Sequence, residues 1–269
     1  MMYEDISKIK VPPEGMVTPR VPHLVFTIIL HIPVLVMAAM GTRDLIKKKS
    51  PTMLCFLAGG YVSSILEAVV DINGMCYFPI EGQIVGIYDY ERAIPLFVVA
   101  TYSWFMGGQG YFFKKSLDAQ VLTKRMLWVR WIATMGVNLL LEIPMLLLGM
   151  YCYYGPQPFK VAGFPIWWLI VNTVIPVSSG FAAHVLAPHL QGWKELFIIL
   201  IVPMADGFSN AALGFPMWCA LNSEWDFSAT YPAFFLTVGL GSFFIWIVSL
   251  YLPTEAPIKL GSEREPLLT

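Results

Sequence analysis

The chain has little charge, and its first residues do not predict a cleavable signal peptide. Asp, Glu, Lys and Arg make up only 13% of its 269 residues, against about 25% in an average soluble domain. The net charge is −1, so bulk electrostatics give no basis for nucleic-acid binding. The first twenty residues contain several charged residues and three prolines, and they lack the apolar run that a cleavable signal peptide needs.

Motifs for metal ions, phosphate and serine nucleophiles are also missing. The four histidines, at 23, 31, 184 and 189, are scattered rather than paired with cysteines at metal-ligand spacing. There is no glycine-rich phosphate loop and no Gly-x-Ser-x-Gly sequence. Gly107, Gly108 and Gly110 lie within an apolar stretch and indicate close packing of helices. We therefore expect neither a metal nor a cofactor.

Apolar residues are abundant and occur in long runs. They make up 57% of the chain, which is typical of a membrane protein. Seven runs are long enough, at about 20 residues, to cross a hydrocarbon core of about 30 Å. The sequence predicts an all-α integral membrane protein, a bundle of about seven transmembrane helices in one domain over 22–252. We expect this domain to be flanked by an N-terminal tail, 1–21, and a disordered cytoplasmic tail, 253–269. The runs are near 22–41, 52–71, 93–113, 127–151, 165–186, 195–220 and 232–252.

The basic residues are distributed unevenly between the two sets of loops. Five of the 17 Lys and Arg residues fall on the side of the N-terminal tail, and the other twelve fall on the opposite side. The positive-inside rule then predicts that the N-terminus is outside or in a lumen and the C-terminus is cytoplasmic. Trp167, Trp168, Trp218 and Trp225 lie near predicted outer ends, as an aromatic belt would.

Three of the predicted spans contain a pair of polar residues four positions apart, which places both members on one helix face. A carboxylate inside hydrocarbon costs roughly 2.5–3.5 kcal/mol on insertion scales and indicates a functional site. The simplest alternative is that these residues only hydrogen-bond the helices together, and Asp71 could simply flank a loop. The pairs are Glu67/Asp71, Asn138/Glu142 and Asp206/Asn210.

The predicted orientation gives these residues similar depths. At 1.5 Å per residue, Asn138 and Asp206 fall near the midplane, and the other members of the pairs fall in the outer half or at its boundary. Asn172 also falls in the outer half, and Tyr102 and Gln109 could close the same cavity from another helix. We expect one site that opens outward or laterally into the outer leaflet.

Such a site suits acid–base chemistry on a lipophilic molecule. A carboxyl group in an apolar wall tends to stay protonated and can act as a general acid, while a second one in a more polar setting can act as a base. Aromatic residues make up 14% of the chain, and their ring faces stabilise cationic intermediates. We expect catalysis by four carboxyl groups, those of Glu67, Asp71, Glu142 and Asp206.

Several stretches resemble the AveC-like spirocyclase family, relatives of the avermectin spiroketal cyclase. The resemblance covers roughly residues 55–190, in pattern rather than in long identical blocks. It implies a multi-span membrane protein that closes a dihydroxyketone polyketide to a spiroketal, with a dehydration. Of the four carboxyl groups, Glu67, Asp71 and Glu142 lie in matching stretches, whereas Asp206 rests on the residue pattern alone. The matching stretches are Leu66–Gly74, Tyr77–Pro79, Ile94–Leu96, Tyr102–Phe105, Gly107–Gly108, Glu142–Pro144 and Trp167–Asn172.

The expected substrate is therefore a lipophilic, polyketide-like small molecule. Five further residues are expected to bind it: Asn138, Asn172, Asn210, Tyr102 and Trp104. Two other functions remain open. A membrane terpene or epoxide cyclase would use the same acid to protonate an alkene or epoxide. A seven-helix transporter or receptor-like protein would use the buried acids to relay protons or bind a ligand.

The C-terminal tail contains a pattern that bears on the cellular location of the protein. Glu263 lies four positions before the pair Leu267 and Leu268, which resembles an acidic dileucine signal read by a sorting adaptor in eukaryotic endomembranes. A bacterial cyclase would not need such a signal, so the tail departs from the family's named member.

Cys76, Cys152 and Cys219 fall on the predicted outer side, where they could form one disulfide, with the pairing open, or remain free thiols.

Overall fold

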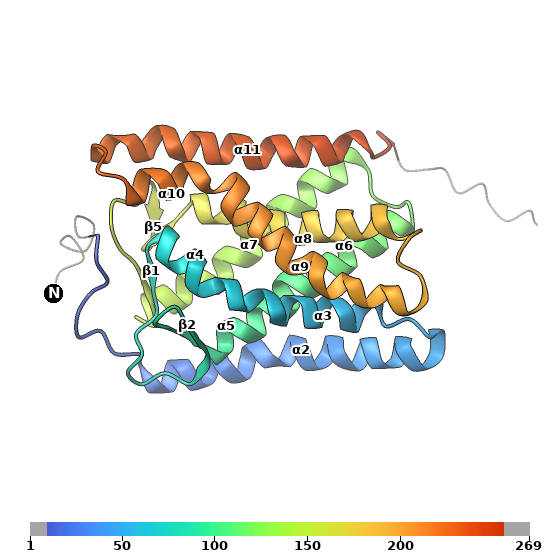
Figure 1. The fold of residues 1–269 in the computed structure, drawn as a ribbon, viewed down its shortest axis with the longest axis horizontal. Coiled ribbons are helices and arrows are strands. Elements are labelled where there is room, and N and C mark those ends of the chain that lie inside the picture. Colours follow the sequence, from blue (N-terminus) through green and yellow to red (C-terminus); the bar gives the residue numbers. More distant parts are fainter. Residues whose placement is uncertain (1–9, 256–269) are drawn as a thin grey trace, which may run out of the picture.

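The computed structural model describes residues 10–255, and it shows a bundle of long helices with three small antiparallel strand pairs at one end (Figure 1). The dileucine-like residues Glu263, Leu267 and Leu268 lie outside the described residues. The helical elements are α2 (Arg20–Lys48), α3 (Thr52–Ser63), η1 (Ser64–Leu66), α4 (Glu67–Gly74), α5 (Leu96–Thr101), η2 (Tyr102–Gly108), α6 (Gln109–Asp118), α7 (Lys124–Leu147), α8 (Trp167–Leu186), η3 (Gly192–Phe197), α9 (Ile198–Gly207), η4 (Phe208–Leu213), α10 (Phe215–Asn222), η5 (Phe227–Ala229) and α11 (Thr230–Leu250).

Six continuous helical stretches are long and apolar enough to cross a membrane, which agrees with a multi-pass helical membrane protein. These stretches are Arg20–Lys48, Thr52–Gly74, Lys124–Leu147, Trp167–Leu186, Gly192–Leu213 and Phe227–Leu250. The seventh predicted run is also helical, as α5, η2 and α6, but it is less apolar because it contains Gln109, several glycines and three tyrosine or serine residues. The count of seven spans and the orientation in the membrane remain predictions.

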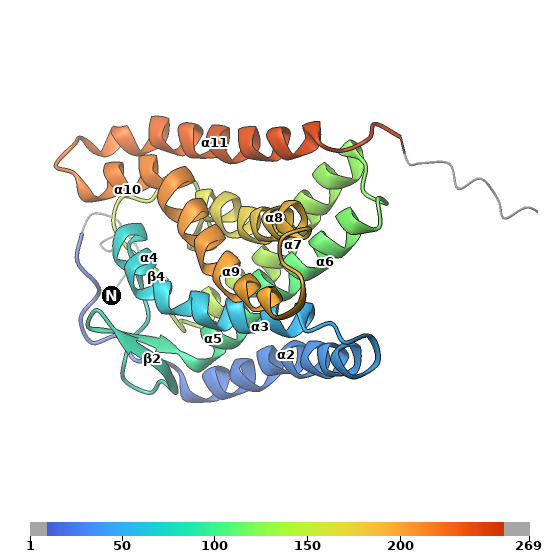
Figure 2. The same ribbon diagram turned by 45° about the vertical axis from the view of Figure 1, so that its right-hand side comes forward.

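The layout separates central from peripheral helices. Figure 2 shows α11 along one edge and α2 along the opposite edge, with α3, α8 and α9 between them. Most residues of α8 are buried, including every one from Trp167 to Gly180. By contrast α2, α7 and α11 expose large apolar side chains such as Leu35, Leu140 and Phe235. In a soluble protein such surfaces would be unfavourable, so they fit contact with lipid.

The strand pairs close the end of the bundle where α2 begins. Strand β1 (Cys76–Tyr77) pairs with β4 (Cys152–Tyr153), β2 (Val85–Asp89) with β3 (Arg92–Pro95), and β5 (Lys160–Val161) with β6 (Phe164–Pro165). The first of these pairs joins the loop after α4 to the loop after α7. Both loops therefore lie over the same part of the helix bundle.

One expectation about this end of the chain was wrong, and of the two cysteine states that the sequence left open the structure has the free thiols. Trp167 and Trp168 do not form an interfacial belt, because they are buried and stack on each other with ring centroids 4.5 Å apart. The Trp167 indole N–H donates to Gln157 Oε1 at 2.9 Å, so its polar atom is satisfied inside the protein. Cys76 and Cys152 do not form a disulfide either. They lie on paired strands, and all four cysteines of the chain are within the described residues as free thiols.

Glycines allow α3 and η2 to approach closely. A Cβ atom on Gly60 would lie 2.8 Å from Ser103 Cα, and one on Gly107 would lie 2.8 Å from the carbonyl carbon of Phe56. Real Cβ atoms do not approach neighbouring backbone this closely. The packing that the glycine-rich stretch predicted is therefore present, and it holds the helix of Tyr102 against the helix that leads into Glu67.

We expect Gly107→Ala to lower the unfolding temperature in detergent, because the added methyl group meets the backbone of α3. Overpacking of this kind costs about 1–3 kcal/mol. Gly136→Ala is the matched control, because a Cβ atom there meets nothing within 4 Å, and alanine favours a helix. Equal unfolding temperatures for the two variants would contradict this account of the contact between α3 and η2.

Candidate functional site

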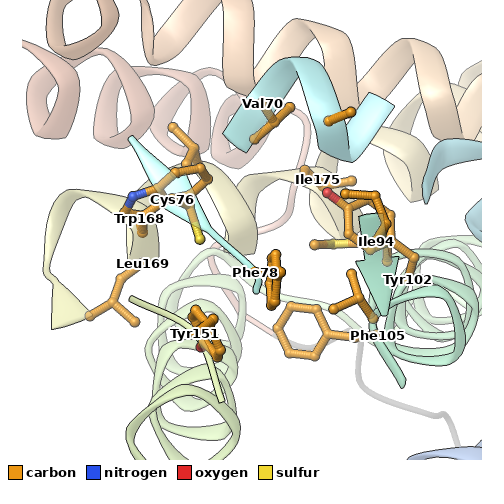
Figure 3. Packing of buried hydrophobic residues seen from close by; sticks show 14 of the residues in the cluster. Val70, Cys76, Phe78, Ile94, Tyr102, Phe105, Tyr151, Trp168, Leu169 and Ile175 are labelled. Atoms are coloured by element: carbon orange, nitrogen blue, oxygen red, sulfur yellow. The ribbon is translucent and has the colours of Figure 1, made fainter. Parts of the chain in front are cut away.

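A buried cavity lies between α4, α5, η2, α7 and α8, under the strand pair β1–β4. Its volume is about 60 Å³, which is room for about four water molecules. Figure 3 shows Phe78, Tyr102, Phe105 and Tyr151 as part of the buried cluster around it. The cavity is lined by Glu67, Asp71, Cys76, Phe78, Phe97, Val98, Thr101, Tyr102, Phe105, Met106, Asn138, Leu141, Glu142, Met145, Tyr151, Tyr153, Trp168 and Asn172.

The first carboxyl group enters from the central helix. Glu67 is the first residue of α4, directly after the 3₁₀ turn η1, and its Oε2 accepts a hydrogen bond from the Tyr102 hydroxyl. Tyr102 begins the π-helical segment η2, a wider turn of the kind that often occurs at functional sites. Within residues 10–255 this is the only hydrogen bond that the Glu67 carboxyl accepts, so Oε1 remains available to a ligand.

Asp71 lies one helical turn after Glu67 and is 3% exposed. The spacing of four residues places both carboxyl groups on the cavity side of α4. Arg92 of β3 acts on Asp71 through its charge. The Arg92 guanidinium also stands over the Tyr77 ring and donates to Tyr154 Oη at 3.4 Å. Asp71 therefore does more than flank a loop, because it belongs to the cavity wall.

Glu142 enters from α7 on another side of the cavity and accepts three hydrogen bonds. Its Oε2 accepts from the Tyr151 hydroxyl and, at 3.3 Å, from the Tyr153 hydroxyl. Its Oε1 accepts from Asn138 Nδ2 at 3.4 Å. Asn172 Nδ2 donates in turn to Asn138 Oδ1 at 3.3 Å. This chain of amides ties α8 to α7 and orients the Glu142 carboxyl.

The two phenols next to Glu142 lie in the loop after α7 and remain donors at neutral pH. Burial, reinforced by the charge of Glu142, raises the pKa of Tyr151 well above its ordinary value. The same causes raise the pKa of Tyr153. The predicted fourth span, 127–151, ends four residues too late, because α7 ends at Leu147. Tyr151 is thus a loop residue that folds back over the cavity.

The fourth predicted carboxyl group does not line the cavity. Asp206 is fully buried in α9, where it accepts hydrogen bonds of 2.7 Å from both Ser63 Oγ and Asn210 Nδ2. Asn210 is also absent from the cavity lining. These residues form a separate polar cluster between α3, α9 and η4.

Trp104 is the remaining predicted binding residue, and it also lies outside the cavity lining. It is half-buried and packs edge-on against Phe105, with ring centroids 5.7 Å apart. The π-helical turn places Tyr102, Phe105 and Met106 toward the cavity, and Trp104 faces another direction. Of the nine residues predicted for the site, six line one cavity: Glu67, Asp71, Glu142, Asn138, Asn172 and Tyr102.

Twelve of the eighteen lining residues were not predicted from the sequence as members of a site, among them Cys76, Tyr151, Tyr153 and Trp168. One signal was available, since the aromatic run from 151 to 154 follows a span that contains a buried acid. The strand pair β1–β4 that brings these loops together is only two residues long in each strand, and such short strands have no recognisable period. No group of three His, Cys, Asp or Glu side chains that could hold a metal ion occurs among residues 10–255.

We expect Tyr151→Phe to destabilise the protein, because it removes a donor from a buried carboxyl group. Hydrogen bonds to charged groups contribute about 1.5–3 kcal/mol, so the unfolding temperature in detergent should fall measurably. Tyr153→Phe is the matched control and should have a smaller effect, since its bond to Glu142 is long at 3.3 Å. An unchanged unfolding temperature in Tyr151→Phe would show that the phenol does not stabilise Glu142.

The raised phenol pKa values also predict a loss of stability at high pH. In the unfolded chain the phenols ionise near pH 10, while in the folded protein they stay protonated to higher pH. The unfolded state therefore loses protons first, and the free energy of unfolding falls as the pH rises above about 10. Tyr151→Phe should show a shallower fall than the wild type between pH 9 and 11, measured by chemical unfolding; equal slopes would contradict the burial of this phenol.

Comparison with known proteins finds that no family model, no curated protein and no solved structure matches the chain.

Proposed function

We propose that the protein is a membrane-embedded cyclase that acts by acid–base catalysis on a lipophilic, polyketide-like substrate, with spiroketal formation and loss of water as the reaction. The observation behind the proposal is that carboxyl groups from two helices line one cavity whose remaining wall is mainly apolar and aromatic. Such a setting keeps proton donors and acceptors close while excluding bulk water. The resemblance to the AveC-like spirocyclase family supports the same reaction.

The roles follow from what each carboxyl group already contacts. Glu67 has one oxygen free of hydrogen bonds from residues 10–255, so it is assigned as the proton donor. Asp71 lies one turn away on the same face of α4, within reach of a group bound at Glu67, so it is assigned as the acceptor. Glu142 uses both oxygens in three hydrogen bonds. It is assigned to position the opposite wall and to polarise the substrate.

The reaction then proceeds in two proton transfers. One hydroxyl of the substrate adds to its ketone and forms a hemiketal. Glu67 donates a proton to the hemiketal hydroxyl, the C–O bond breaks, water leaves, and an oxocarbenium ion forms. The second hydroxyl attacks that carbon and gives its proton to Asp71. The net change is the loss of one water, and a proton returns from Asp71 to Glu67 before the next turnover.

The cavity as described holds only the reacting part of such a substrate. Its volume of about 60 Å³ is far below the roughly 300–1,000 Å³ of pockets that enclose a whole ligand. The rest of the molecule must lie elsewhere along the helices. A lateral position between helices would agree with the predicted opening toward the lipid.

We expect Glu67→Gln to lower turnover of a dihydroxyketone substrate by about 10²–10⁴-fold, the usual contribution of a placed proton donor. The purified protein in lipid nanodiscs would be given the substrate, and the loss of one water would be followed by mass spectrometry. Asp206→Asn is the matched control, because it also replaces a buried carboxyl group by an amide but lies outside the cavity. Its loss of turnover should be far smaller.

The alternatives give different outcomes in the same assay. A terpene or epoxide cyclase would isomerise an epoxy-isoprenoid without a change in mass and would leave the dihydroxyketone untouched. A transporter would show proton-dependent flux in vesicles that is abolished by Asp206→Asn. Normal turnover in Glu67→Gln would remove the proton-donor role from this residue.

A further inference from the structure

A second hollow lies between α6 and α7, directly next to the cavity along the bundle. Its volume is about 600 Å³, ten times that of the cavity. Apolar side chains form most of its wall, among them Phe113, Trp131 and Val177. Its polar residues include Lys115 and Arg130. This hollow, which we call the α6–α7 groove, is large enough for a small-molecule ligand.

The cavity and the groove occupy successive turns of the same three helical segments. On η2 and α6 the lining passes from Met106 in the cavity to Gln109 in the groove. On α7 it passes from Asn138 to Val137 and Thr134, and on α8 from Asn172 to Pro176. Each step is one to four residues, or at most about one helical turn of 5.4 Å. The two hollows are therefore stacked along one seam of the bundle.

A polar contact between α6 and α7 lies at the end of the groove nearest the cavity. Thr134 Oγ1 donates to Gln109 Oε1 across the seam at 3.4 Å, and the same hydroxyl donates to the Arg130 carbonyl within its own helix at 2.9 Å. The contact across the seam is the longer of the two. Because it links α6 and α7 through flexible or small side chains, its opening would join the groove to the cavity.

The far end of the groove has two cations that form no salt bridge among the described residues, although Asp44 of α2 lies close enough to interact with the Lys115 charge. Arg130 Nη1 donates to Ser116 Oγ at 2.6 Å, a neutral acceptor. Within residues 10–255, neither Arg130 nor Lys115 has a carboxylate within 4 Å, whereas the neighbouring Lys114 pairs with Asp118 at 2.6 Å. A positive end and apolar walls are complementary to a ligand with an anionic head and an apolar chain.

We propose that the α6–α7 groove binds the substrate as a single-chain amphiphile, with its anionic head, a carboxylate, at Arg130 and Lys115 and its chain directed toward the cavity. This inference rests on the proposed function and specifies its substrate class. Arg130 precedes Asn138 by eight residues and Glu142 by twelve. At 1.5 Å per residue, the acid-sensitive group would lie about 12–18 Å from the head.

The binding site can be tested without turnover. The probe is a long-chain fatty acid with bromine atoms in mid-chain, added to the protein in phosphatidylcholine nanodiscs. Bromine quenches nearby indoles, and Trp131 lies in the groove wall. We expect saturable quenching by the acid, a smaller quenched fraction in Trp131→Phe, and weaker binding of the uncharged methyl ester.

Charge variants should separate the head site from general partition into lipid. Arg130→Gln combined with Lys115→Gln should weaken binding of the acid about tenfold or more, since a charge-assisted bond contributes about 1.5–3 kcal/mol. Arg125→Gln is the matched control, because Arg125 is an exposed cation on the same helix and is not part of the groove lining. It should bind the acid as the wild type does.

Three results would overturn the inference. Equal quenching by the acid and its methyl ester would show that the cations do not select the head. Quenching that rises without saturation would show only partition into the bilayer. Complete competition by an anionic phospholipid in the nanodisc would assign the groove to bilayer lipid. If the acid binds as expected but no dihydroxyketone is converted, the groove assignment stands and the proposed reaction fails.

Discussion

A carboxyl group buried among apolar helices needs hydrogen-bond donors close by, and this requirement organises the centre of the protein. Three of the four buried acids are matched to neutral donors: Tyr102 for Glu67, Tyr151 and Tyr153 for Glu142, and Ser63 for Asp206. Neutral donors satisfy the oxygens without adding a second buried charge, which would cost further desolvation. The donors come from different helices and from a loop, so the same bonds also hold these elements together.

The loops at the end of the bundle where α2 begins are part of this arrangement rather than a simple lid. Strand β4 pairs with β1 and places the phenols of Tyr151 and Tyr153 over the Glu142 carboxyl. The Trp167 indole is satisfied by Gln157 in the same region. These loop side chains thus find hydrogen-bond partners inside the protein. They cover one end of the cavity, and the α6–α7 groove lies along the seam beyond its other end.

The seam between α6 and α7 offers a route by which a lipophilic ligand could pass from the membrane to the carboxyl groups of the cavity. Helix α7 is peripheral and exposes large apolar side chains, while its inner face contributes Asn138 and Glu142 to the cavity. One or two turns away, the same face contributes Thr134 and Arg130 to the groove. A helix that contacts lipid on one side and both hollows on the other is suited to admit a lipophilic ligand laterally. A path from the lipid avoids moving an apolar molecule through water.

The helical class, the approximate spans and the three polar pairs were readable from the sequence, because hydrophobic run length and a spacing of four are local properties. Local spacing also explains why Asn138 and Glu142, and likewise Asp206 and Asn210, are hydrogen-bonded pairs. Which of the polar pairs share a cavity depends on how each helix is rotated about its axis and on which helices pack next to each other. Both are set by packing between segments that are distant in the sequence. The close approach of α3 and η2 and the two-residue strand pair β1–β4 therefore placed Glu67 and Tyr151 in one cavity, left Asp206 outside it, and buried Trp168 away from the interface.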